Sequence, residues 1–227
     1  MKRVLFGVAA LALVAAAGVA VWLYLSLDWI VKRAIESYVP DIIGAEVKLE
    51  SVALSPASGA GVITGVAIGN PKGFSAPQAA SVRTVDVAVD PATVAKDVVL
   101  VRRIAIVGPT ITYQTGRNGS NFDALKRNVD RYVGKRDPGA ARGGTRLIVD
   151  SLTIRGATVN FVPELPVRGA TISYTLPDIR LVDVGKRQGG VTPGELSKIV
   201  LDALVSRMAQ AMGRRAAERG LQNLLGR

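Results

Sequence analysis

The sequence predicts a mainly β protein with helices, an α+β fold made of an N-terminal transmembrane helix, a curved antiparallel β-sheet and a C-terminal amphipathic helix. Three observations predict it: an uncharged apolar run near the start, apolar residues at alternate positions through the middle, and helical spacing near the end. At 227 residues the chain has room for one anchor and one domain. The predicted parts are a cytoplasmic tip (1–3), the transmembrane anchor (4–26), a continuation helix (27–43), the β-rich domain (45–184) and the C-terminal helix (192–227).

The anchor is predicted by residues 4–25, which carry no charge and are long enough to cross roughly 30 Å of hydrocarbon as a helix. Two tryptophans and a tyrosine lie near one end of this run, where aromatic side chains favour a membrane interface. Lys2 and Arg3 favour a cytoplasmic N-terminus. A cleaved signal peptide is the alternative, because residues 15–17 are small enough to precede a cleavage site. The apolar run continues beyond them, which favours an anchor.

Directly after the anchor, apolar residues recur at helical spacing, and this predicts a helix over 27–43 with one apolar side. Pro40 and Gly44 would end it. Packing against the following sheet is the simplest role for such a helix. Its apolar positions are Leu27, Ile30, Val31, Ala34, Ile35 and Tyr38.

From residue 45 the apolar spacing changes to two, which is typical of half-buried antiparallel strands. Turn residues such as those at 70–73 separate the strands. A helix is predicted over 121–133, with Ser120 or Asn121 as its cap. A charged, glycine-rich loop follows at 135–144, and strands resume over 147–154, 157–162, 170–176 and 179–184.

Segments 101–113 and 149–161 resemble one another, since each consists of a strand, a glycine and a second strand. When Gly108 is aligned with Gly156, apolar residues coincide on both sides of the glycine. Glycine lets a strand bend sharply, so the sequence predicts the same bent pair of strands twice. The coincident positions are 101/149, 104/152, 106/154, 111/159 and 113/161.

Helical spacing returns at residue 192, where Thr192 and Glu195 have the spacing of a capping box. The predicted helix is long, basic and amphipathic. Its first half, 196–208, is expected to cover the sheet, and its arginine-rich end to contact a membrane surface or a partner. The residues predicted to contact the membrane surface are Arg207, Arg214, Arg215 and Arg219.

The chain has no cysteine and no histidine, which excludes thiol and imidazole catalysis and nearly every zinc, copper or haem site. Its carboxylates form no pair suited to acid and base catalysis: Asp86, Asp90 and Asp97 are spread over a strand and a turn, and Asp178 and Asp183 are an odd number of residues apart. We therefore expect no enzyme activity, no cofactor and no metal. The net charge of +11, beside a membrane segment, favours membrane phospholipid as the partner over nucleic acid.

Three segments follow the anchor in a recognisable order: Ile68–Phe74 (IGNPKGF), Ile104–Ile111 (IAIVGPTI) and Gly116–Leu125 (GRNGSNFDAL). Together they resemble the N-terminal module of AsmA-like proteins, large envelope proteins of Gram-negative bacteria. The resemblance implies a periplasmic domain, anchored in the inner membrane by a single pass, whose sheet curls into a half-pipe with an apolar floor. It also implies association with phospholipid movement or envelope maintenance. This chain is much shorter than family members that bridge the periplasm, which argues against an extended lipid conduit.

Two functional hypotheses follow. In the first, the protein is a non-enzymatic protein of envelope maintenance that binds lipid acyl chains on the apolar face of its sheet, with a role in phospholipid transport. In the second, it is an anchored scaffold that binds another envelope protein through a sheet edge or the C-terminal helix. They differ in whether that helix covers the apolar face. The predicted floor residues are Val85, Val87, Val89, Ile104, Ile106, Leu152 and Ile154.

Overall fold

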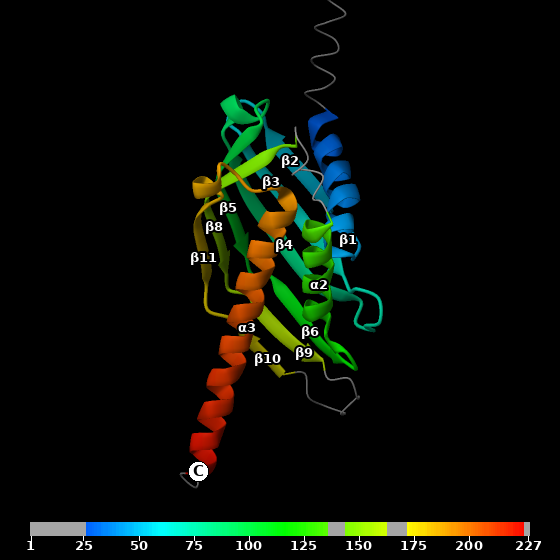
Figure 1. Cartoon of the computed structure of the whole chain (residues 1–227), viewed down its shortest axis with the longest axis vertical. Helices are drawn as coiled ribbons and strands as arrows, with labels where there is room; N and C mark the ends of the chain where they lie inside the picture. Colours follow the sequence, from blue (N-terminus) through cyan, green and yellow to red (C-terminus); the bar gives the residue numbers. More distant parts are fainter. Residues whose placement is uncertain (1–25, 136–143, 163–171, 225–227) are drawn as a thin grey trace, which may run out of the picture.

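A computed structural model describes residues 26–135, 144–162 and 172–224, with only the backbone for 172 and 214–224 (Figure 1). The chain begins with a helix over 26–43. The strands are β1 (Val47–Lys48), β2 (Ser51–Ser55), β3 (Ala60–Gly69), β4 (Gln78–Val89), β5 (Val98–Val107), β6 (Thr110–Gly116), β7 (Gly119–Ser120), β8 (Arg146–Arg155), β9 (Thr158–Val162), β10 (Ile172–Thr175) and β11 (Ile179–Val184). The other helices are η1 (Pro91–Thr93), α2 (Asn121–Gly134), η2 (Lys186–Gln188) and α3 (Pro193–Leu224). The predicted α+β class is confirmed.

The predicted anchor and the cytoplasmic tip lie outside the described residues, as does most of the loop predicted at 135–144. Within the described ranges, no helix combines the length and the apolar character needed to cross a membrane. The helix over 26–43 agrees with the predicted continuation helix. We call the end of the molecule where this helix begins the proximal end, and the opposite end the distal end (Figure 1).

The strands form one mixed sheet in which β3 and β4 run the whole length and their neighbours change midway. In the proximal half the order is β2-β3-β4-β5-β8-β11, and in the distal half it is β1-β3-β4-β6-β9-β10. The sheet therefore has a crease across its middle. Gly65, Gly108 and Gly156 lie on this crease, and each has a positive φ near 60° that favours glycine.

The internal repeat predicted from the sequence is confirmed, and its two copies lie side by side. Strand β5 pairs with β8, and β6 with β9, in the same register as the sequence alignment: Val101 opposite Val149, Ile106 opposite Ile154, and Ile111 opposite Val159. Both pairings are parallel, so the prediction of a purely antiparallel sheet was wrong. The long connection through α2 returns the chain to the starting end of β5, which makes parallel pairing possible.

Both long helices begin as their sequences predicted. The Ser120 hydroxyl accepts the Asp123 amide, and the Asp123 carboxylate accepts the Ser120 amide, so α2 opens with a capping box. Thr192 and Glu195 make the same reciprocal contacts at the start of α3. Four N–H groups at each helix start lack partners within the helix, and these caps satisfy part of them.

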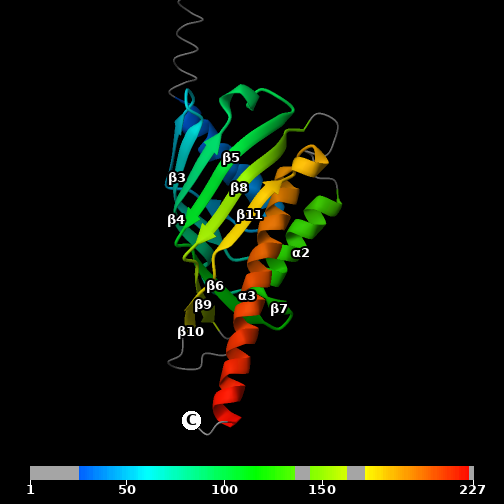
Figure 2. The ribbon, with the colours of Figure 1, turned by 90° about the vertical axis from the view of Figure 1, so that its left-hand side faces the viewer.

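Helices α2 and α3 lie together on one side of the sheet, as the side view shows (Figure 2). Helix α3 covers β8 and β11, and its Met208 is among the most buried side chains of the core. Toward solvent, α2 and α3 are joined by the ion pairs Lys126–Asp202 and Lys198–Asp130. The apolar side of the helix over 26–43 packs on β1, β2 and β3 in a second cluster. The predicted covering of the sheet by the first half of the C-terminal helix is thus confirmed.

A buried network of amide side chains joins the turn after β3, strand β6 and helix α2. Asn121 is fully buried; its amide nitrogen donates to Asn70 Oδ1 and to the Thr112 carbonyl, both at 2.7 Å. Its oxygen accepts the backbone amides of Gln114, at 3.0 Å, and Phe122, at 3.1 Å. The Gln114 side chain in turn holds the 75–76 turn. Asn70, Gln114 and Asn121 therefore fasten three elements together.

Candidate functional site: an apolar groove

An apolar groove of about 560 Å³ lies between the helix over 26–43 and the proximal half of the sheet. Leu27, Val31 and Ile35, which follow one another at one turn of helix, form one wall. The opposite wall comes from β2, β3 and β4, and includes Leu54 and Ile63. The volume of the groove lies within the roughly 300–1,000 Å³ that is usual for small-molecule sites.

All seven predicted floor residues share one face of the sheet, because strand pairing places them in continuous rows. One row runs Ile63, Val85, Ile106, Ile154 and Ile179 across five strands. The next row contains Val87, Ile104 and Leu152. The face as a whole is therefore apolar, as the alternation in the sequence predicted.

The groove exposes only part of that face. Val87 and Val89 line it directly. Leu152 and Ile154 are only 2% and 5% exposed, because they lie in the main core beneath α3. Val85, Ile104 and Ile106 are half-buried. A lipid could reach Val87 and Val89 with the helices in place, whereas reaching Leu152 and Ile154 would require α3 to move. The lipid-binding role of all seven residues stays a prediction.

Three charged residues on one side of the helix over 26–43 hold it against the sheet edge. The Asp28 carboxylate accepts the Leu54 amide at 2.8 Å, and the Glu36 carboxylate accepts the Leu49 amide at 2.8 Å. Between them, Lys32 donates to the Glu50 carbonyl at 3.0 Å. Residues 28, 32 and 36 are spaced by one helical turn, so together they satisfy backbone groups along the edge formed by β2 and the two residues before it. These contacts fix the helical wall of the groove.

Replacing Asp28 with Ala is expected to loosen the contact locally, because the Leu54 amide loses its acceptor. Hydrogen exchange of the Leu54 amide should quicken by about fivefold to tenfold, as one modest hydrogen bond is lost. Exchange at Leu49 should change little. Glu36→Ala should have the converse effect, faster exchange at Leu49 and little change at Leu54. Equal effects at both amides in both variants would mean that the helix leaves the edge as one unit.

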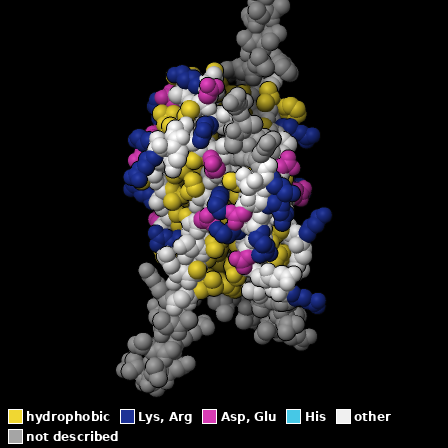
Figure 3. All heavy atoms as spheres, viewed as in Figure 1, with side chains coloured by type: hydrophobic (Ala, Val, Ile, Leu, Met, Phe, Trp, Pro, Cys, Tyr) yellow, Lys and Arg dark blue, Asp and Glu magenta, His cyan; other side chains and the backbone are white. Residues whose placement is uncertain are grey.

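The groove opens at the proximal end, where the turn between β4 and β5 forms its rim. Asp90 accepts the Arg102 guanidinium and the Ala92 amide, and these contacts lower the pKa of the Asp90 carboxyl. They hold the turn that carries Val94, which lines the groove and is 61% exposed. Trp29, 67% exposed, lies at the same end, where hydrophobic side chains gather beside the start of the helix (Figure 3). The rim of the groove therefore carries one exposed apolar side chain, Val94, and Trp29 exposes another at the same end of the domain.

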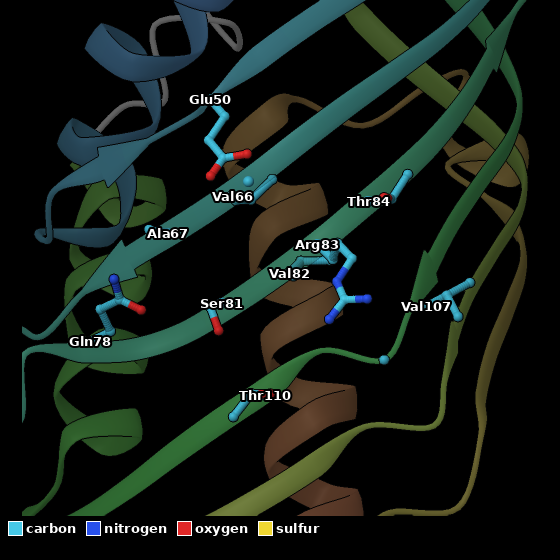
Figure 4. A pocket seen from close by; sticks show the side chains of 12 residues that line it. Glu50, Val66, Ala67, Gln78, Ser81, Val82, Arg83, Thr84, Val107 and Thr110 are labelled. Carbon is cyan, nitrogen blue, oxygen red and sulfur yellow. The ribbon is translucent and has the colours of Figure 1, made fainter.

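A larger cleft, of about 820 Å³, lies on the opposite face of the sheet, where β5 and β6 part at Gly108 (Figure 4). It is a consequence of the crease. Its lining is mixed, with Glu50 and Arg83 among serine, threonine and valine side chains. Polar and apolar side chains alternate along this cleft, and its polar groups do not converge on one point where they could bind a ligand together. We therefore take the apolar groove as the candidate site.

No catalytic arrangement emerges among the described residues. The groove is lined by apolar side chains and a single serine, so it holds no group able to move a proton at neutral pH. Asp90 is paired with Arg102, and Asp183 with Lys186, in separate parts of the fold. Across the same described ranges, no group of three acidic side chains could hold a metal ion. The expected absence of enzyme activity stays a prediction.

The predicted contact of the C-terminal arginines with a membrane surface also stays a prediction. Arg207 is half-buried, and the side chains of Arg214, Arg215 and Arg219 lie outside the described residues. The backbone of α3 runs past the sheet at the distal end (Figure 1). Its arginine-rich end therefore points away from the proximal end, so any surface that it contacts differs from one lying against Trp29.

No protein-family model matches the chain, and a search of curated proteins finds no match. The resemblance to AsmA-like proteins rests on the three segments alone. Two of these segments supply the half-buried Asn70 and the buried Asn121, whose hydrogen bond joins the turn after β3 to α2.

Proposed function

We propose that this protein is an inner-membrane-anchored, non-enzymatic envelope protein that accommodates a phospholipid acyl chain in the groove beside the helix over 26–43. The observation that supports the proposal most is the apolar lining of the groove, with an open rim at the end where residues 4–25 join the domain. A periplasmic position and a part in phospholipid transport follow from the resemblance to AsmA-like proteins and belong to the same proposal.

The size of the groove is suitable for part of one acyl chain. Each buried methylene contributes about 0.8 kcal/mol, so about eight methylenes would contribute about 6 kcal/mol before the cost of ordering the chain. An interaction of this strength allows the protein both to capture a lipid and to release it. The phospholipid headgroup would stay at the rim beside Val94, in contact with water.

Photocrosslinking can test the proposal. An aliphatic diazirine amino acid replaces Leu54, in the groove wall, and the full chain is irradiated in phospholipid nanodiscs. We expect a covalent adduct with an acyl chain, identified by mass spectrometry. Its control has the same amino acid at Val182, which is 54% exposed and pairs with Ser151 on the opposite face of the sheet.

Equal lipid labelling at both positions would mean that lipid contacts the domain without selection, which contradicts the proposal. A protein adduct at Leu54 in cells, with no phospholipid bound in native mass spectrometry, would instead favour the anchored scaffold.

A further inference from the structure

Exposed apolar side chains gather at the proximal end of the domain. Of the six large apolar side chains that are exposed in the described residues, Trp29, Ile30 and Val94 lie there. Trp29 and Ile30 belong to the first turns of the helix over 26–43, and Val94 belongs to the turn between β4 and β5, which reaches the same end (Figure 1). A single exposed apolar side chain is ordinary, whereas several at one end of a domain indicate a contact surface.

The turn between β4 and β5 holds Val94 in a fixed position. The Thr93 hydroxyl donates to the Asp90 carbonyl at 2.8 Å and accepts the Leu100 amide at 3.0 Å. The Asp90 carboxylate is bound by the Ala92 amide and by Arg102, both described above. These hydrogen bonds fix the turn without using the Val94 side chain, which stays exposed beside the mouth of the groove.

The same end of the domain adjoins the uncharged run of residues 4–25. Trp29 follows that run by four residues, which is about 6 Å of helix. Tryptophan favours the interface between headgroups and acyl chains, and with the run in a bilayer Trp29 would lie at that level. We infer that the turn between β4 and β5 is a second contact with the same bilayer, and that Val94 enters its interfacial layer. Lys96 and Asp97 follow in the turn and limit it to this layer, where charged side chains stay hydrated.

Two contacts would fix the orientation of the domain on the membrane, and the inference rests on the anchor that the proposed function includes. Held by the helix over 26–43 alone, the domain would be free to rotate about the helix axis. Leu27, two residues before Trp29, and Val94 line the same groove, so the two contacts flank its mouth. An acyl chain would then pass from the bilayer into the groove without exposing its methylenes to water.

Site-directed spin labelling can test the inference on the full chain in phosphatidylcholine nanodiscs. The chain has no cysteine, so Ala95→Cys accepts a single label. Ala95 is exposed, lies next to Val94 and is not part of the groove lining, so the label reports the bilayer and not a lipid inside the groove. Oxygen, which concentrates in lipid, and a nickel chelate, which stays in water, measure its depth. We expect a depth of about 5–10 Å into the boundary between headgroups and acyl chains.

Val107→Cys provides the control label. Val107 is also an exposed valine, but it lies at the other end of β5, which has 10 residues and therefore spans about 30 Å. A label there should be in water. In the Ala95→Cys background, Val94→Asp should return the label at position 95 to water, because a carboxylate opposes entry into the interface. Val94→Leu should leave the depth unchanged.

Three outcomes would overturn the inference. The nickel chelate could reach the labels at positions 95 and 107 equally, neither reagent could reach position 95, which would indicate a protein partner, or Val94→Asp could leave the depth unchanged. A chain that does not elute with nanodiscs would refute the anchor and this inference together. The groove is tested separately: a label in lipid without an adduct at Leu54 refutes acyl binding alone, and an adduct at Leu54 with the label in water refutes only the second contact.

Discussion

Asn121→Ala is expected to lower the free energy of unfolding by about 3–5 kcal/mol. The substitution removes four hydrogen bonds in a fully buried position and leaves the amides of Gln114 and Phe122 without their acceptor. It also deprives Asn70 of its donor, so the turn after β3 loses its attachment to α2. Urea unfolding of the full chain in detergent micelles, followed by circular dichroism, measures the change.

Asn118→Ala is the matched control, because Asn118 is exposed in the β6–β7 turn three residues away. This substitution should lower the free energy of unfolding by no more than about 0.5 kcal/mol. Similar costs for the two variants would show that the network contributes little.

Val31→Glu should reduce acyl-chain labelling from position 54 by about tenfold or more. Val31 is in the helical wall of the groove, so the new carboxylate would project among apolar side chains and draw water into the space that a lipid would occupy. Because Val31 is only half-buried, the carboxylate can stay hydrated and the domain should remain folded.

Ala34→Glu places the same charge on the same helix, at an exposed position outside the groove lining. Labelling from position 54 should be unchanged in this variant. If Val31→Glu and Ala34→Glu reduce labelling equally, the charge acts through the membrane surface and not through the groove. If the Val31→Glu variant gives a normal yield of the acyl-chain adduct at position 54, the groove is not the site where the acyl chain binds.

The long helices could be predicted from sequence because their signals are local. Ser120 and Asp123, or Thr192 and Glu195, specify a helix start within four residues, and the apolar spacing specifies the rest. The parallel pairing of β5 with β8 was missed for a physical reason. Parallel and antiparallel strands both alternate with a period of two, so alternation cannot distinguish them. The alignment of Gly108 with Gly156 already contained the register.

The groove could be predicted only in part, since its walls come from segments far apart in the chain. The alternation of Val87 and Val89 indicated an apolar face, and the spacing of Leu27 and Val31 indicated an apolar helix side. That these two surfaces face each other with space between them depends on packing. Leu54, Ile63, Val94 and Val99 were missed because no local signal separates a groove residue from a core residue.

The contacts of Asp28, Lys32 and Glu36 with the sheet edge also determine how often the groove would meet its ligand. A flexible linker lets a domain tumble, so a binding surface faces the membrane for only part of the time. Here the helix and the sheet are joined by three contacts over two helical turns. With residues 4–25 in a bilayer, as the sequence predicts, capture of a lipid becomes an intramolecular step. The effective concentration of acyl chains at the rim then depends on the geometry of one helix and not on diffusion.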